Sequence, residues 1–402
     1  MNERELSAAR CVTGFLLAIC LVLGGFPGIV PYPATAQEQK QDPEQKPQED
    51  AAALVEEGVE KAKSGEFEQA LELLTRALEL LPEQPEVHFN LGVVLENLDR
   101  VEEAIPHYEE AIRLKPDLPG AYNNLGNAFW KTGNIDKAEE MFREALVVNP
   151  DYDLAKINLG NVLLAREKPE EALAVFREVK EKTPDSAQVH YLEGRSLALF
   201  GSYEQAVNAY EKALSLDPQM NEALFHLGLA WGLLGNREKE VEIFRQYVDK
   251  KPDDPAGFLQ LGTALVKNRN YPEAETALKK AVELDPQSFA GWNNLAQVLV
   301  FMAHYEEALK AAEMAVGINP ASPQAHNSLG FALVGVDRFE EAQGAFEEAI
   351  RLDPDFADPH YGLGVAALLS GDTRTAQKQK EILQGINPRM ADQLDNLIRQ
   401  GE

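Results

Sequence analysis

Apolar residues recur along most of the chain at intervals of three and four residues, the spacing of one face of an α-helix. Two such faces occur between residues 119 and 152, formed first by Tyr122, Leu125 and Phe129 and then by Ala138, Phe142 and Leu146. Gly133 lies between the two faces and is typical of a turn, and Pro150 is expected to end the second segment. This stretch therefore predicts two antiparallel helices.

The same pattern returns every 34 residues. If Ala51 is position 1 of the first copy, position 8 is small in every copy, being Gly58, Gly92, Gly126, Gly160, Gly194, Gly228, Gly262, Ala296, Gly330 and Gly364. Proline recurs at the same interval near the end of each copy, from Pro82 to Pro388. Ten copies then follow without insertion, at residues 51–84, 85–118, 119–152, 153–186, 187–220, 221–254, 255–288, 289–322, 323–356 and 357–390.

Residues 119–152, PGAYNNLGNAFWKTGNIDKAEEMFREALVVNPDY, resemble the consensus of the tetratricopeptide repeat. The resemblance implies an all-α fold, an α-solenoid in which ten helix-turn-helix repeats form a right-handed superhelix. The physics agrees, because one helical hairpin cannot bury its apolar face alone and must stack on its neighbours. Residues 391–402 are expected to form a C-terminal capping helix, since Leu394, Leu397 and Ile398 are spaced along one helical face.

The resemblance also implies that the first helices line a concave groove, with positions 5, 9 and 12 of each repeat facing it and position 6 beside them. The candidate ligand-binding residues are Asn123, Asn127, Trp130, Asn158, Asn161, Tyr191, Arg195, Asn293, Gln297 and Asn327. Amides among apolar groups suit a peptide, whose backbone they can bond while its side chains pack. The alternative is that the asparagines only tie neighbouring helices together.

Signals for catalysis, metals and cofactors are weak. Four histidines occupy position 4, where other repeats have Tyr122, Phe258 or Trp292, so we interpret them as packing residues: His88, His190, His326 and His360. Equivalent positions of adjacent repeats are at least one helix layer apart, roughly 8–10 Å, which is too far for shared metal ligation. We therefore expect no enzyme, no metal and no cofactor. The net charge of −28 argues against nucleic acid as a partner.

The N-terminal segment predicts export. Residues 11–30 carry no charge, and Ala34-Thr35-Ala36 offers small residues where a signal peptidase reads them, so residues 1–36 are interpreted as a signal peptide cut after Ala36. The alternative is an uncleaved membrane anchor. Residues 37–50 contain no large apolar residue and are expected to form a disordered linker.

The resulting hypothesis is an exported, non-catalytic scaffold that binds a peptide or protein segment in a bacterial-type envelope, either periplasmic or extracellular. Two alternatives stay open, an adaptor anchored in the inner membrane and a recruiting subunit for a separate envelope enzyme that modifies glycans or proteins. One repeat is unusual, because Glu240 and Tyr247 replace the two small alanines of its second helix. Bulky groups at close helix crossings force wider spacing, so we expect a local change of superhelical pitch there.

Overall fold

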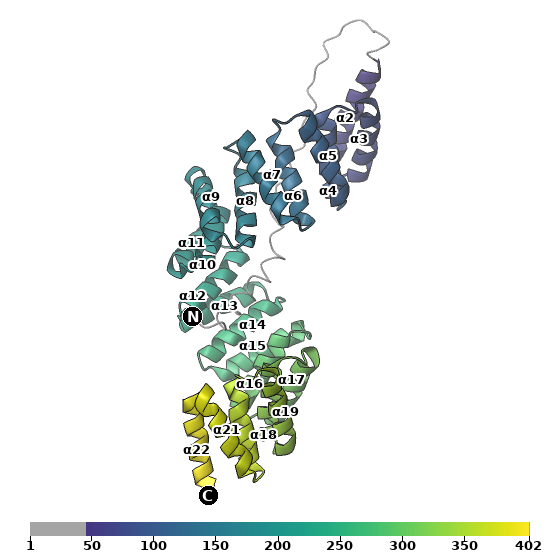
Figure 1. Ribbon diagram of the computed structural model, residues 1–402. Coiled ribbons are helices and arrows are strands. Elements are labelled where there is room, and N and C mark those ends of the chain that lie inside the picture. The colour runs from purple at the N-terminus through teal and green to yellow at the C-terminus, as the bar shows by residue number, and fades with distance from the viewer. Residues whose placement is uncertain (1–45, 402) are drawn as a thin grey trace. The chain divides into compact units, whose positions relative to one another are not determined.

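The computed structural model describes residues 46–401, which form helices joined by short turns and contain no strand. Each repeat is a helical hairpin (Figure 1). The first helices are α2 (Lys46–Lys63), α4 (Pro85–Asn97), α6 (Pro119–Lys131), α8 (Asp153–Ala165), α10 (Ala187–Leu199), α12 (Asn221–Leu233), α14 (Pro255–Lys267), α16 (Phe289–Phe301), α18 (Pro323–Gly335) and α20 (Ala357–Leu369).

The second helices follow the first after three turn residues. They are α3 (Phe67–Leu80), α5 (Val101–Leu114), α7 (Ile135–Val148), α9 (Pro169–Lys182), α11 (Tyr203–Leu216), α13 (Arg237–Lys250), α15 (Tyr271–Leu284), α17 (Tyr305–Ile318), α19 (Phe339–Leu352) and α21 (Thr373–Ile386), and α22 (Pro388–Gly401) ends the described chain. The prediction of an all-α solenoid is confirmed, and the right-handed superhelix stays a prediction.

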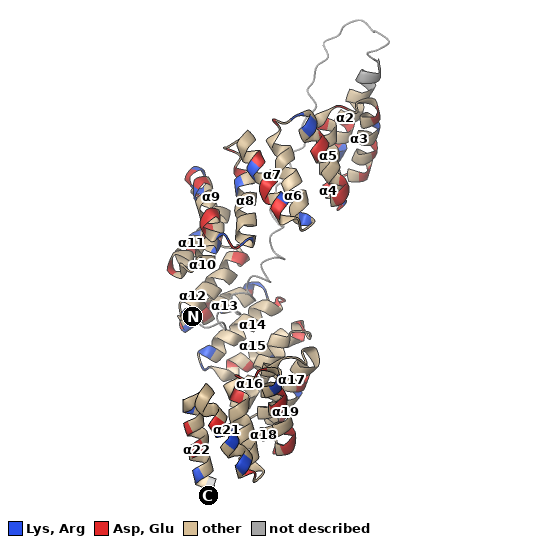
Figure 2. Cartoon of the chain, viewed as in Figure 1, with Lys and Arg blue, Asp and Glu red and all other residues tan. Residues whose placement is uncertain are grey.

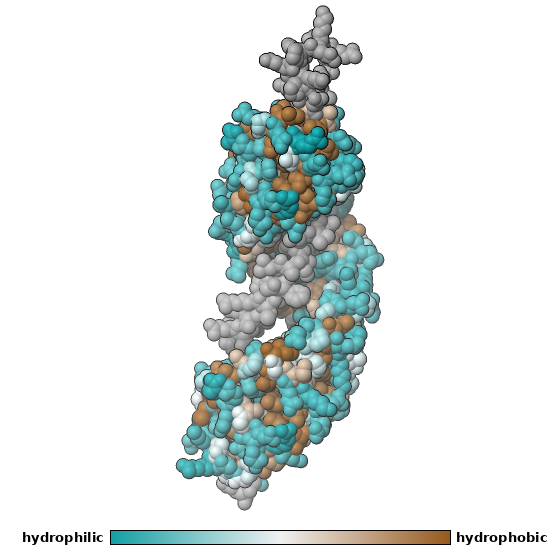
Figure 3. Space-filling model, turned by 90° about the vertical axis from the view of Figure 1, so that its right-hand side faces the viewer, coloured by the Kyte–Doolittle hydropathy of each residue, from teal (hydrophilic) through white to brown (hydrophobic). Residues whose placement is uncertain are grey.

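The repeats form two compact bodies, one ending at Leu216 and the other beginning at Asp217. We call them the N-terminal body, which holds the first five repeats, and the C-terminal body, which holds the last five and α22. Within each body the surface is mostly hydrophilic, with hydrophobic patches between the polar ridges (Figure 3). No helix among residues 46–401 is long and apolar enough to cross a membrane.

The recurring glycine lets the two helices of a hairpin approach closely. A Cβ atom on Gly126 would lie 2.7 Å from the ring of Phe142 in the second helix, closer than real Cβ atoms come. The same arrangement joins Gly92 to Tyr108, Gly160 to Phe176, Gly194 to Tyr210, Gly228 to Phe244 and Gly330 to Phe346. The period seen in the sequence is therefore a period of close helix contacts, which one large buried ring fills in these six repeats.

The other four repeats follow the same rule, and in two of them a leucine replaces the ring, Leu74 facing Gly58 and Leu278 facing Gly262. Where Ala296 replaces glycine, the partner position holds the small Ala312, and both are fully buried. In the last repeat the partner position is Lys380, and Leu394 of α22 takes the place of the ring, 2.5 Å from where a Cβ on Gly364 would be. The C-terminal helix thus covers the last hairpin by filling the contact that its own second helix leaves open.

The sixth repeat accommodates its bulky residues with extra glycines. Glu240 is only 3% exposed, and its carboxylate lies 2.5 Å from where a Cβ on Gly232 would be. The ring of Tyr247 lies equally close to Gly257 of the next repeat. Small residues on the facing helices therefore offset the large ones, and the expected change of pitch stays a prediction.

Two boundaries differ from the sequence expectation. Helix α2 begins at Lys46, so the last residues of the predicted disordered linker are helical, since a proline such as Pro47 is tolerated in a first helical turn. Helix α22 begins at Pro388 rather than at residue 391 for the same reason. The predicted signal peptide, residues 1–36, lies outside the described residues.

Candidate functional site

The first helices of successive repeats lie side by side within each body, as α6 beside α8 and α18 beside α16 and α20. Positions 5, 9 and 12 of these helices form one stripe, because residues three and four apart share a helical face. We call it the inner stripe. All but one of the ten candidate residues lie on it, and Asn158 occupies the neighbouring position 6.

In the N-terminal body, three of the candidate asparagines are joined by hydrogen bonds. The amide nitrogen of Asn158 donates to the amide oxygens of Asn123, at 2.9 Å, and Asn127, at 3.2 Å. Asn123 is fully buried and donates in turn to Asn124, at 3.3 Å. Asn123 and Asn158 therefore tie α6 to α8, as the alternative interpretation of the asparagines expects.

A buried chain of polar groups lies beside these amides. The hydroxyl of Tyr108 donates to the carboxylate of Glu96, at 2.8 Å, and Lys131 of the next repeat pairs with the same carboxylate at 2.8 Å. Burial raises the pKa of the Tyr108 phenol well above its usual value, and the Glu96 charge adds to the shift. The phenol therefore stays protonated and serves as a donor within the interior.

The remaining candidates of this body differ in their surroundings. The guanidinium of Arg195 lies over the ring of Tyr191, 5.8 Å from its centre, and both side chains are buried. Trp130 is half-buried. Asn161 is also half-buried, and its amide oxygen is a buried acceptor without a hydrogen-bond partner in the described residues. A buried acceptor without a partner calls for an explanation, and a hydrogen-bond donor on a bound ligand would provide it.

The C-terminal body has the same kind of hydrogen bond between neighbouring first helices and also has an unpaired acceptor. The hydroxyl of Ser328 donates to the amide oxygen of Asn293 at 2.9 Å, in the same register as the Asn158–Asn123 bond. Asn294 donates to the hydroxyl of Thr263 at 3.2 Å. Asn327 is 8% exposed, and among the described residues its amide oxygen finds no hydrogen-bond partner. Gln297 is half-buried.

An apolar row was missed in the sequence, although the repeat period could have revealed it. Position 12 of the C-terminal body is half-buried and aliphatic in four successive repeats, at Val266, Val300, Val334 and Leu368. Position 9 adds three further half-buried apolar side chains, Leu229, Phe331 and Val365. The inner stripe of each body thus combines three amide side chains with a majority of apolar ones, and the N-terminal body adds the charged Glu96 and Arg195.

The histidines at position 4, which were predicted to be packing residues, also form hydrogen bonds. Each donates its Nε2–H to the carbonyl oxygen of a proline six residues earlier, with distances of 3.0 Å for His88, 2.8 Å for His190, 2.9 Å for His326 and 2.9 Å for His360. The Nε1 group of Trp292 makes the same bond at 3.0 Å. Among residues 46–401, no cluster of three histidine, cysteine, aspartate or glutamate side chains could hold a metal ion.

The chain is similar to several known structures. It shares 25% identity with YrrB, described as a TPR protein with an unusual peptide-binding site, over 46% of this chain and 96% of that one, with a TM-score of 0.42. It shares 24% identity with MamA from Desulfovibrio magneticus RS-1, over 42% of this chain and 95% of that one, with a TM-score of 0.41. Yeast Tom70 shares 17% identity over 89% and 96% of the two chains, with a TM-score of 0.38.

No curated protein sequence matches the chain. The sequence pattern of the tetratricopeptide repeat matches residues 55–119, 123–187, 191–255, 259–326 and 327–376, and a second pattern of the same description matches residues 98–147. These matches span most of the chain and agree with the hairpins and their spacing. The chain belongs to the tetratricopeptide repeat family.

Proposed function

We propose that the protein is a non-catalytic scaffold that binds an extended peptide or protein segment along the inner stripe. The proposal rests on each body separately: a buried, unpartnered amide oxygen, on Asn161 in the N-terminal body and on Asn327 in the C-terminal body, occurs on an inner stripe that also carries half-exposed apolar side chains. An amide oxygen can accept a backbone N–H of a peptide, and the apolar side chains can pack on its alternate residues. Tetratricopeptide repeat proteins typically bind proteins without catalysing a reaction.

Site-specific photo-crosslinking tests the binding surface. A benzophenone amino acid in place of Phe331, on the inner stripe, should crosslink to a partner in extracts. The same amino acid in place of Met314, which is 43% exposed on the second helix α17, is the matched control and should not. Crosslinks from Met314 alone would place the binding surface elsewhere.

We further propose that the protein is exported and works in the cell envelope, on the basis of the uncharged N-terminal run and its small-residue motif. The mature chain should then begin at Gln37, and mass spectrometry of the protein from an envelope fraction reads this residue directly. A chain that retains residues 1–36 in the membrane fraction would favour the anchored adaptor. Stable co-purification with a catalytic chain would favour the recruiting subunit.

A further inference from the structure

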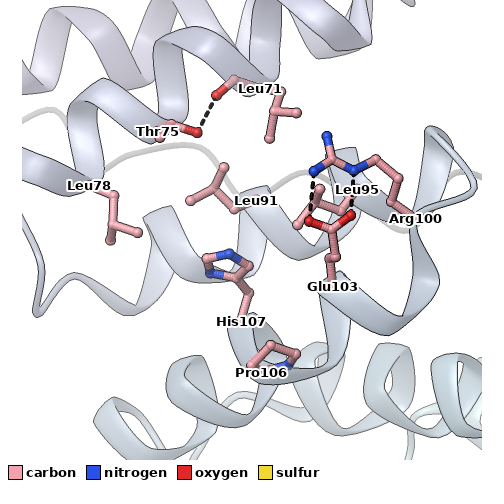
Figure 4. A pocket seen from close by; sticks show the side chains of 9 residues that line it. All are labelled: Leu71, Thr75, Leu78, Leu91, Leu95, Arg100, Glu103, Pro106 and His107. Atoms are coloured by element: carbon pink, nitrogen blue, oxygen red, sulfur yellow. Dashed lines mark hydrogen bonds and ion pairs between the residues drawn. The ribbon is translucent and has the colours of Figure 1, made fainter.

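A cavity on the other side of the N-terminal body offers a second binding site. It lies between the second helices α3 and α5, measures about 400 Å³ and is open to solvent (Figure 4). Leu91 and Leu95 of α4 line it together with Leu71 and Leu78 of α3. This volume is within the range of sites that hold small ligands or single large side chains.

The polar groups around the cavity are already paired with one another. The hydroxyl of Thr75 donates to the carbonyl of Leu71 at 2.7 Å, and Arg100 forms two bonds of 2.7 Å with Glu103. Figure 4 shows both interactions at the rim of the cavity. A ligand would therefore find mainly apolar surface, with little polar bonding capacity left to satisfy.

A histidine lines the cavity from α5. His107 occupies position 23, which is a large aliphatic residue in four of the other repeats, alanine in four and glutamine in one. The His107 ring is held against His88, with 3.2 Å between the two Nδ1 atoms. Leu91 and Leu95 are 1% and 3% exposed, whereas Leu71 and Leu78 of α3 are half-buried, so the leucines open to a ligand are those of α3.

The equivalent place between α9 and α11 has a different chemistry. A cavity there is floored by Glu193 in place of Leu91, and Lys180 bonds to both oxygens of that carboxylate, at 2.7 and 2.8 Å. Ion pairs thus occupy that position, and its chemistry is polar. Of these two cavities, only the one between α3 and α5 has an apolar floor.

The helices beside the apolar cavity are acidic. Helix α3 carries Glu68, Glu72 and Glu79 against one base, Arg76, and α5 carries four glutamates against Arg113. Figure 2 shows acidic residues on both helices. Complementary charge steers and orients a partner, so basic residues on either side of an apolar side chain fit this surface.

We propose that the cavity between α3 and α5 binds a leucine-sized apolar side chain of a partner segment that carries lysine or arginine on both sides. The apolar side chain displaces water from the half-buried Leu71 and Leu78, and the flanking cations lie near the glutamates of the two helices. This site is separate from the inner stripe, so it allows the scaffold to hold two different segments.

A labelled, end-capped peptide, Lys-Lys-Ser-Leu-Ser-Lys-Lys, tests the proposal by fluorescence anisotropy with the full chain at low salt. Replacing its leucine by alanine should weaken binding at least tenfold, because roughly three buried carbon groups are lost. Replacing its lysines by glutamates should abolish binding. Thr75→Phe fills the cavity from an exposed helical position and should also weaken binding at least tenfold.

Thr276→Phe is the matched control, since Thr276 is an exposed helical threonine whose hydroxyl likewise bonds to a carbonyl four residues earlier, at 3.1 Å. This variant should bind the peptide like the unaltered protein. Equal binding of the leucine and alanine peptides would reduce the interaction to charge and overturn the proposal. It would also be overturned if Thr75→Phe bound normally, or if the unaltered protein did not bind the leucine peptide at all.

Discussion

At the scale of single residues, the turn inside each hairpin shows how the sequence tolerates local strain. Position 15 has a positive φ in every repeat, between +57° and +87°, and only half of the repeats use glycine there. Left-handed backbone costs a residue with a side chain about 1–2 kcal/mol, whereas glycine adopts it freely. The non-glycine turns, such as Ala303 at φ +59°, are therefore places where stability can be gained.

Ala303→Gly should raise the free energy of unfolding by about 0.5–1 kcal/mol, because relief of strain exceeds the added freedom of the unfolded chain. Gly133→Ala, at φ +79° and with no atom near its added Cβ, should lower it by about 1 kcal/mol. Thermal melts of both variants measure the change. A loss of stability in Ala303→Gly would show that contacts of the alanine methyl, rather than the backbone, decide this position.

The roles of the asparagines of the inner stripe can be distinguished by their hydrogen-bond partners. Asn123→Ala should cost about 1–3 kcal/mol of stability, since it takes a bond from the buried amides of Asn158 and Asn124. Asn161→Ala should leave stability nearly unchanged and weaken partner binding, because its amide oxygen has no partner in the described residues. Thermal melts and titrations with the crosslinked partner decide this, and equal stability losses would assign both residues to helix ties.

The sequence could predict the hairpins but not the difference between these asparagines. The helices of the hairpins can be predicted because the spacing of apolar residues follows the backbone geometry of a helix. Whether Asn123 or Asn161 faces a ligand depends on which side chain of the neighbouring helix comes within 3 Å, and that requires the packing of two repeats. The same holds for the cavity between α3 and α5, because the contact between the His107 and His88 rings cannot be predicted from either residue alone.

At the scale of helices, the glycine and its facing ring act as one unit. Gly126→Ala should destabilise the protein by about 1–3 kcal/mol, because the added methyl meets the ring of Phe142 at 2.7 Å. In a Phe142→Ala background the same change should cost much less, which a double-mutant cycle measures as a coupling energy. Gly344→Ala is the control, since its Cβ would meet nothing within 4 Å, and it should stabilise α19 slightly.

At the scale of the whole molecule, we expect stability to vary from repeat to repeat, because each hairpin contacts only its neighbours. The sixth repeat should be weaker than the third. Two helical glycines, Gly232 and Gly257, make room for Glu240 and Tyr247, and a glycine inside a helix costs roughly 0.5–1 kcal/mol relative to alanine. In addition, one oxygen of the buried Glu240 carboxylate has no hydrogen-bond partner in the described residues, although Lys267 pairs with the other at 2.8 Å.

Hydrogen exchange measured by mass spectrometry should therefore show faster exchange in residues 221–254 than in residues 119–152. The double variant Glu240→Ala, Gly232→Ala restores the small residue of the other repeats and removes a helical glycine, so it should slow exchange in residues 221–254. It should leave residues 119–152 unchanged, which serve as the internal control because local opening reports local stability. Uniform exchange across both repeats, or no response to the double variant, would mean that the facing glycines compensate fully for the bulky side chains.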